Sequence, residues 1–149
     1  MAARCPDGHP CVVTTYPLRR RGPSVAVFPT LYWLTCPRLC KLVSHLERDG
    51  VIAAVQAELD GDAAMRARLG REHEEYIARR WAMLLPADRA VVAERGLGEE
   101  LRGRGIGGMT NRAAVKCLHL HVAYHLVSGN VIGEWVMERY GVRGCAAER

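Results

Sequence analysis

The sequence predicts an α+β fold, a mainly helical single domain with a small N-terminal β-hairpin or sheet. Two observations predict it. Valine, threonine and aromatic residues gather in the first 35 residues, where turn-forming residues interrupt them. From residue 36 onward, hydrophobic residues recur at helical spacing. A length of 149 residues suits one domain, and we expect residues 1–140 to form it, with residues 141–149 as a flexible C-terminal tail.

The N-terminal segment is expected to be extended. CVVTTYP (residues 11–17) is a short β-prone run, and Pro17 with the following RRRGP indicates a loop. SVAVFPTLYWLT (residues 24–35) comes next, and Pro29 divides it into two short strands or makes it an edge strand. A small hairpin or sheet follows from this pattern.

Four helices are predicted over residues 37–94. Pro37 suits a first helical turn, and Asp49-Gly50 ends that helix. A second helix covers residues 51–59, and Asp62 is an N-cap for a third that reaches about residue 85. Pro86 begins a short fourth. The hydrophobic residues of the first helix lie at i, i+3, i+4 and i+7, namely Leu39, Leu42, Val43 and Leu46.

The C-terminal third begins with GLGEELRGRGIGGMTN (residues 96–111), whose six glycines should prevent a regular helix. We expect it to be a flexible connection rather than an anion site flanked by arginines. VKCLHLHVAYH (residues 115–125) then forms an amphipathic helix, capped by Thr110 or Asn111 and ended by Ser128-Gly129-Asn130. A last helix covers residues 131–140.

Composition restricts the environment of the protein. No segment approaches the ~20 apolar residues that span a bilayer, and the N-terminus lacks the apolar region of a signal peptide. We therefore expect a cytoplasmic protein. The net charge is +5, and the Arg19–Arg21 run most simply lies in a solvated loop. In reducing cytosol, clustered cysteines indicate metal or redox chemistry more often than disulfides.

The stretch VKCLHLHVAYH places one thiol and three imidazoles within nine positions. In a regular helix Cys117, His121 and His125 share one stripe, and His119 lies on the opposite flank of the hydrophobic face. Cys117 with His121, or His121 with His125, can therefore point at one metal ion. His119 can join only if the helix begins late and Cys117 lies in its first turn.

Further ligands must come from elsewhere in the chain, because one helix supplies at most two or three. Cys5 and Cys36 are each followed by proline, and Cys36 precedes a helix whose dipole favours a thiolate. Cys5, Cys36, Cys117 and one histidine would form a Cys3His set, for which zinc is the commonest occupant.

A plainer interpretation has the cysteines as buried or loop residues and the histidines as partly exposed helix residues. Cys11 lies six residues after Cys5 and could substitute as a ligand, but an inward-facing strand residue explains it equally well. Cys40 is expected to serve packing, and Cys145 to lie in the tail without a role. His73, in the charged run REHEEY, is expected to face solvent. Substituting Cys117 should abolish metal binding, whereas substituting Cys11 or Cys145 should leave it unchanged.

The motifs RCPDGHP, FPTLYWLTCPRL, GIGGMTN and VKCLHLHVAYHL together resemble an uncharacterised, largely actinobacterial family, the domain of unknown function numbered 501. This resemblance implies a shared site and no activity. The site falls on Cys5, Cys36, Cys117, His119 and His121, and Cys11, Cys40 and His125 do not belong to the pattern. It favours His119 as well as His121, so either histidine stays open as the ligand.

Three functions are compatible with these features. The first is a cytosolic metal-binding domain in which a zinc site joins the Cys-Pro segments to the Cys117 helix. The second is an iron–sulfur protein with redox or sulfur-transfer-type activity, in which His119 or His121 donates a proton. The third is a basic module that binds a partner or nucleic acid through the arginines at 19–21 and 102–112.

Overall fold

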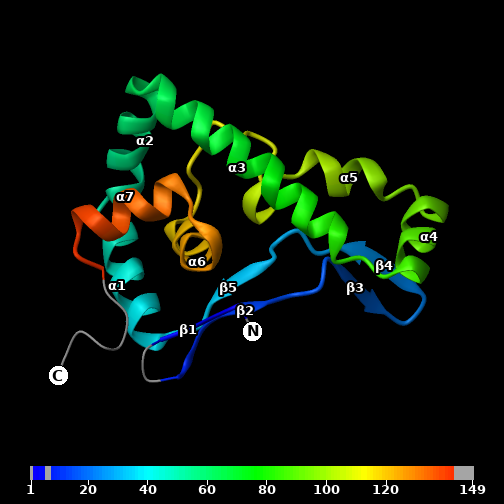
Figure 1. Cartoon of the computed structure of the whole chain (residues 1–149). Helices are drawn as coiled ribbons and strands as arrows, with labels where there is room; N and C mark the ends of the chain where they lie inside the picture. Colours follow the sequence, from blue (N-terminus) through cyan, green and yellow to red (C-terminus); the bar gives the residue numbers. More distant parts are fainter. Residues whose placement is uncertain (1, 6–7, 143–149) are drawn as a thin grey trace.

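A computed structural model of the chain describes residues 2–5 and 8–142 (Figure 1). The strands β1 (Ala3–Arg4), β2 (Pro10–Thr14) and β5 (Tyr32–Leu34) form an antiparallel sheet in the order β1-β2-β5. The helices follow β5 in sequence. The predicted α+β class with a small N-terminal sheet is therefore confirmed. Residues 143–149 of the predicted tail, Cys145 among them, lie outside the described residues, whereas Val142 is buried.

A separate hairpin is made by β3 (Leu18–Arg21) and β4 (Ser24–Val27). Arg19–Arg21, predicted as part of a loop, lie in β3 and pair with β4 from Leu18↔Val27 to Arg21↔Ser24. The loop prediction was wrong because Gly22, at φ +55°, supplies the tight turn that folds the arginine run back on β4. The three arginines are exposed, as expected of a solvated segment.

The helices are α1 (Pro37–Arg48), α2 (Val51–Gly61), α3 (Ala63–Ala82), α4 (Pro86–Glu94), α5 (Gly98–Gly103), the short 3₁₀ turn η1 (Ile106–Gly108), α6 (Leu118–Ser128) and α7 (Val131–Arg139). The first four and α7 agree closely with the predicted segments. Asp62 caps α3 as predicted, since its Oδ1 accepts from the N–H groups of Ala64 and Met65 at 2.8 and 2.9 Å. No helix within the described ranges is long and apolar enough to cross a membrane.

Two segments differ from the prediction. The glycine-rich run contains the six-residue helix α5, whose Leu101 is buried against Leu18, Leu84 and Val92. Tertiary packing therefore overcomes the low helix propensity of glycine there. The other difference is α6, which begins at Leu118 instead of near residue 111.

The late start of α6 has a tertiary cause. Cys117 is the N-cap residue, in an extended conformation with φ −154° and ψ 125°, and its side chain makes no capping hydrogen bond. The cap comes from α1, because Glu47 Oε1 accepts from the N–H of Leu118 at 2.6 Å. A carboxylate at a helix N-terminus is favoured by the helix dipole.

The helix α6 lies at the centre of the molecule, with α7, α1 and the strands β5 and β2 packed around it (Figure 1). Its Leu118, Val122 and Tyr124 are fully buried and belong to the main hydrophobic core. The Cys117 segment is therefore placed at the junction between the helices and the sheet.

Candidate metal centre

The five predicted ligands lie in three different places. Cys117 and His119 stand at the start of α6 beside Glu47 of α1. Cys5 and Cys36 accompany Cys11 where α1 begins, next to β1 and β2. Since Cys36 and Glu47 are at opposite ends of α1, eleven residues apart, they are separated by about 16 Å. One ion cannot bind all the predicted cysteines in this structure.

The donor atoms of Glu47, Cys117 and His119 all lie within 4.8 Å of one another, the only such set among the described residues. His119 Nδ1 is 3.2 Å from Glu47 Oε1 and 3.8 Å from Cys117 Sγ. The pairing of Cys117 with His119 arises because the helix begins late and leaves Cys117 extended. The helical i, i+4 geometry that would pair Cys117 with His121 is not formed.

The orientation of His119 is set by α1. Its Nε2 lies 3.2 Å from the carbonyl oxygen of Cys40 and 3.3 Å from Ser44 Oγ. A carbonyl oxygen only accepts, so Nε2 carries a proton that is directed at Cys40. Nδ1 faces a carboxylate oxygen and a sulfur, where it can donate a proton to Glu47 or bind a metal ion. Three electron-rich atoms in such an arrangement favour a cation between them, either a proton or a metal ion.

The surroundings of the site shift the pKa values of Glu47 and Cys117 in opposite directions. Burial opposes the ionisation of Glu47, but hydrogen bonds from Cys117, His119 and the Leu118 N–H outweigh it and lower the pKa of the carboxyl group. Burial, together with the negative charge of Glu47, raises the pKa of the Cys117 thiol. Without a metal ion the thiol is therefore protonated at neutral pH, and a metal ion would displace that proton.

The site borders solvent. The side chains of His119 and Glu47 are 27% and 24% exposed, and Cys117 is half-buried. An ion there could be reached from outside and could keep a water ligand.

His121 lies in a different, fully buried network. Its Nδ1 is 3.0 Å from Asn130 Oδ1, which also accepts from the Gly133 N–H, while Asn130 Nδ2 donates to Glu72 Oε2 at 2.7 Å. These bonds distinguish the oxygen of the Asn130 side-chain amide from its nitrogen. Because an amide oxygen only accepts, His121 Nδ1 donates to it, and His121 Nε2 holds a lone pair. His121 is thus positioned for packing inside the protein and not for a site with Cys117.

His73 is fully buried, so the prediction that it faces solvent was wrong. Its Nδ1 accepts from the Ile106 N–H at 3.0 Å, which leaves the ring proton on Nε2. The Nε2 atoms of His73 and His121 make no hydrogen bond to any residue that the structure describes. A sequence signal was present, because His73 lies four residues after Leu69 and four before Ile77, on the buried face of α3.

Glu47 was missed by the sequence analysis. It is one carboxylate near the end of a helix, and its position beside Cys117 and His119 depends on α6 packing against α1. No local pattern identifies it. Cys11 is buried in the hydrophobic core, which agrees with an inward-facing strand residue.

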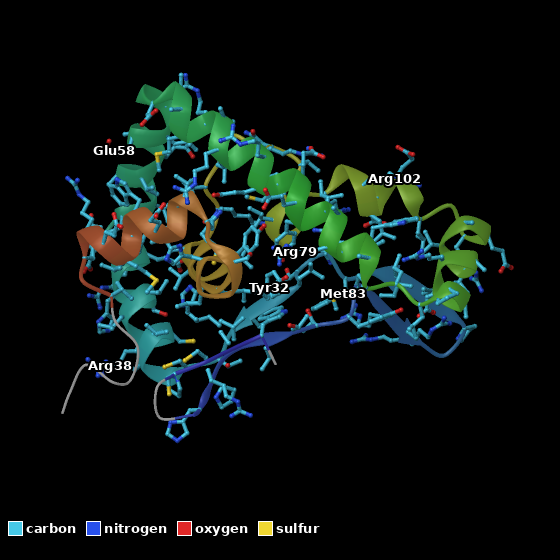
Figure 2. All side chains as sticks on the ribbon, in the orientation of Figure 1. Tyr32, Arg38, Glu58, Arg79, Met83 and Arg102 are labelled. Carbon is cyan, nitrogen blue, oxygen red and sulfur yellow. The ribbon has the colours of Figure 1, made fainter. Side chains whose placement is uncertain are left out.

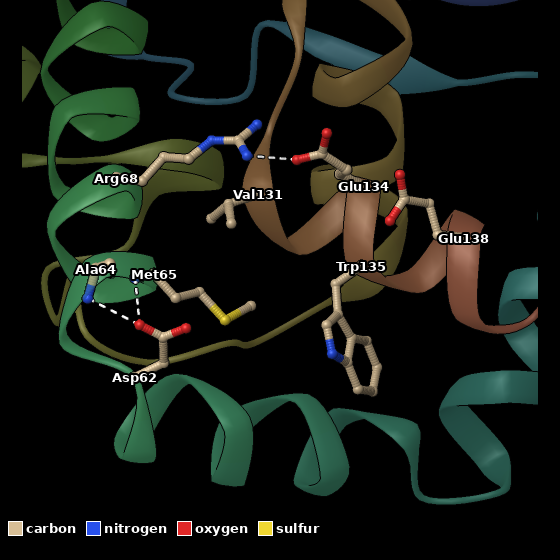
Figure 3. Close-up of a pocket in the computed structure, with 8 residues that line it drawn as sticks. All are labelled: Asp62, Ala64, Met65, Arg68, Val131, Glu134, Trp135 and Glu138. Carbon is tan, nitrogen blue, oxygen red and sulfur yellow. Dashed lines mark hydrogen bonds and ion pairs between the residues drawn. The ribbon is translucent and has the colours of Figure 1, made fainter.

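A hollow lined by charged residues lies elsewhere, between the start of α3 and α7 (Figure 3). It has a volume of about 360 Å³. Its polar groups already serve the fold: Asp62 caps α3, and Glu134 pairs with Arg68. This hollow therefore has no feature of a catalytic or metal site.

Residues 1–138 match the model of a family described as protein of unknown function (DUF501). The chain belongs to this family. The DUF501 match includes all five residues predicted as ligands, and the resemblance stated from the motifs is confirmed. No curated protein and no solved structure matches the chain. The family description names no activity, so function has to be argued from the site.

Proposed function

We propose that this DUF501 chain binds a zinc ion through Glu47, Cys117 and His119. The observation that supports this most directly is the orientation of His119. Its Nε2–H is bound to a backbone carbonyl, and its Nδ1 is left toward a thiol and a carboxylate. A metal-bound histidine usually has such an outer hydrogen bond. Zinc accepts sulfur, nitrogen and oxygen ligands together.

The zinc ion would fasten α1 to the start of α6. Glu47 already joins these two elements by capping α6 at Leu118, and Cys117 and His119 flank that residue. The free energy of metal binding would then add to the stability of the central packing contact. The proposed ion would link α1 to α6, whereas the sequence analysis expected an ion that links the Cys-Pro segments to the Cys117 helix.

Three protein ligands leave the fourth position to water. This is the ligand count of catalytic zinc sites, whereas structural sites have four protein ligands. The partial exposure of Glu47 and His119 is compatible with that arrangement. When bound, zinc would supply a Lewis acid and lower the pKa of its water.

The alternatives have less support. An iron–sulfur cluster on Cys5, Cys36 and Cys117 would have to reach from the start of α1, where Cys5 and Cys36 lie, to its end, where Cys117 lies beside Glu47. These positions are about 16 Å apart. The basic module would use the arginines at 19–21 and 102–112, and four of these six residues have a carboxylate partner. The pairs are Arg20 with Asp88, Arg102 with Glu99, Arg104 with Glu100 and Arg112 with Glu74.

Zinc content and affinity test the proposal. Purified protein and its Glu47→Gln, Cys117→Ser and His119→Gln variants would be equilibrated with zinc and a competing chelator. Each variant should retain one ion fewer than the wild type. The matched control is His125→Gln, on the same helix but directed at the backbone of Asn130, and it should bind as the wild type does. Equal zinc binding by wild type and Cys117→Ser would refute the proposal.

A separate experiment tests whether water occupies the fourth coordination position of the ion. With cobalt in place of zinc, added thiocyanate should change the visible absorption bands of the wild type, because it replaces the water ligand. A cobalt spectrum that does not respond to thiocyanate would indicate four protein ligands instead.

A further inference from the structure

Three further thiols converge at the other end of α1. Cys11 lies on β2, and its carbonyl oxygen accepts from the N–H groups of Thr35 at 2.8 Å and Cys36 at 3.4 Å. The adjoining strand β1 pairs with β2 through Arg4↔Pro10, which brings Cys5 to the same place. Figure 2 shows sulfur atoms gathered where the start of α1 meets β1 and β2. Two strands and one helix N-terminus thus direct cysteines to one point.

The side chains of these cysteines are buried and in contact. Cys5, Cys11 and Cys36 are 6%, 4% and 2% exposed. Cys11 lies between the other two and shares side-chain hydrogen bonds with both. A packing role would be met by any small apolar residue, whereas three thiols from separate segments, with Cys11 in contact with each of the other two, provide the sulfur donors that soft metal ions prefer.

We infer that Cys5, Cys11 and Cys36 form a second, sulfur-only site for a thiophilic cation of the zinc or cadmium type. This site is distinct from the Glu47–Cys117–His119 centre. It assigns a ligand role to Cys11, for which the sequence interpretation left ligand and packing roles open. The three sulfur atoms do not yet lie within 4.8 Å of one another. Metal binding would therefore bring the Cys5 and Cys36 sulfur atoms closer together around Cys11.

The charges balance for such an ion. Burial and the neighbouring Cys36 and Cys5 raise the pKa of Cys11 to about 11, so its thiol is protonated in the ion-free protein. A divalent ion would replace three S–H protons with three sulfur–metal bonds and release three protons, which leaves a net charge of −1. The N-terminus of α1 offsets it, because Cys36 is the N-cap and the first turn has no acidic residue.

The fourth position of the ion would be filled by water or by Cys40. That cysteine lies one turn further along α1, near Cys36, and its Sγ lies 3.3 Å from the carbonyl oxygen of Leu34. It is the next thiol along the same helix.

Metal titration of the reduced, ion-free chain tests this inference. Cadmium-113 NMR reports how many sulfur atoms surround each ion, and cobalt gives near-ultraviolet charge-transfer absorption that grows with thiolate number. The wild type should show a sulfur-rich signal. Cys11→Val should lose it, since valine suits a buried strand but provides no ligand. Cys117→Ser should keep it while losing the ion of the other centre.

Several outcomes would overturn the inference. A sulfur-rich signal that survives in Cys11→Val, or that disappears in Cys117→Ser, would place the ligands elsewhere. Mass spectrometry of protein isolated without reductant would show whether Cys11 forms a disulfide. A disulfide at Cys11 would indicate a redox role for the cysteines in place of metal binding. Circular dichroism checks that Cys11→Val is folded. Cys5→Ala, at the strand end, is the second variant, and it should also lose the sulfur-rich signal.

Discussion

Lowering the pH from 7 to 5 should destabilise the fold, because two histidines that are neutral in the folded chain become charged when it unfolds. His73 and His121 are fully buried, and burial lowers the pKa of each from 6.5 to about 4. Between these values the unfolded chain binds more protons than the folded chain. The free energy of unfolding therefore falls as the pH falls through this window.

The magnitude follows from the two pKa values. Linkage gives a loss of roughly 2 kcal/mol per histidine between pH 7 and pH 5, or roughly 4 kcal/mol for both. A typical domain has only about 5–15 kcal/mol of stability. The structure explains why the neutral rings are retained. Each Nδ1 already has its hydrogen bond, and a second proton on His121 Nε2 would be buried without an acceptor among the described residues.

Urea denaturation followed by tryptophan fluorescence, at pH 7 and at pH 5, measures this loss. His121→Gln and His73→Gln should each remove about half of the pH dependence, whatever their effect at pH 7. His45→Gln is the control, because His45 is exposed on α1 and should leave the pH dependence unchanged. A wild type equally stable at both pH values would refute the assignment of two buried neutral histidines.

Other perturbations have defined outcomes. Arg80 is fully buried and donates to the carbonyl oxygens of Pro29, Leu101 and Gly105, so Arg80→Met should lower the free energy of unfolding by at least about 3 kcal/mol in urea titrations. Gly105→Ala would place its Cβ 2.2 Å from His73 Nδ1 and should lower the melting temperature, whereas Gly103→Ala meets no atom within 4 Å and should not. A chelator should lower the melting temperature of the zinc-loaded wild type by more than that of zinc-loaded Cys117→Ser, which lacks the ion of the Glu47–Cys117–His119 centre, as calorimetry would show.

The order of helices and strands was predictable because the signals are local. Proline at the starts of α1 and α4, Asp62 before α3 and the glycines that follow helices act within a few residues of themselves. Hydrophobic spacing identified the buried faces for the same reason. Where local preference and packing disagree, as in α5 and at residues 111–117, the local rules failed.

The sequence by itself determined the α+β class, the DUF501 family and which cysteines and histidines were candidates for a site. Only the tertiary structure decided how these residues combine. Glu47, from a helix 70 residues earlier, caps α6 and keeps Cys117 extended, and this brings Cys117 together with His119. The pairing of β2 with β5 brings Cys11 to Cys36. The physical reason is that donor sets depend on contacts between distant segments, which no local pattern encodes.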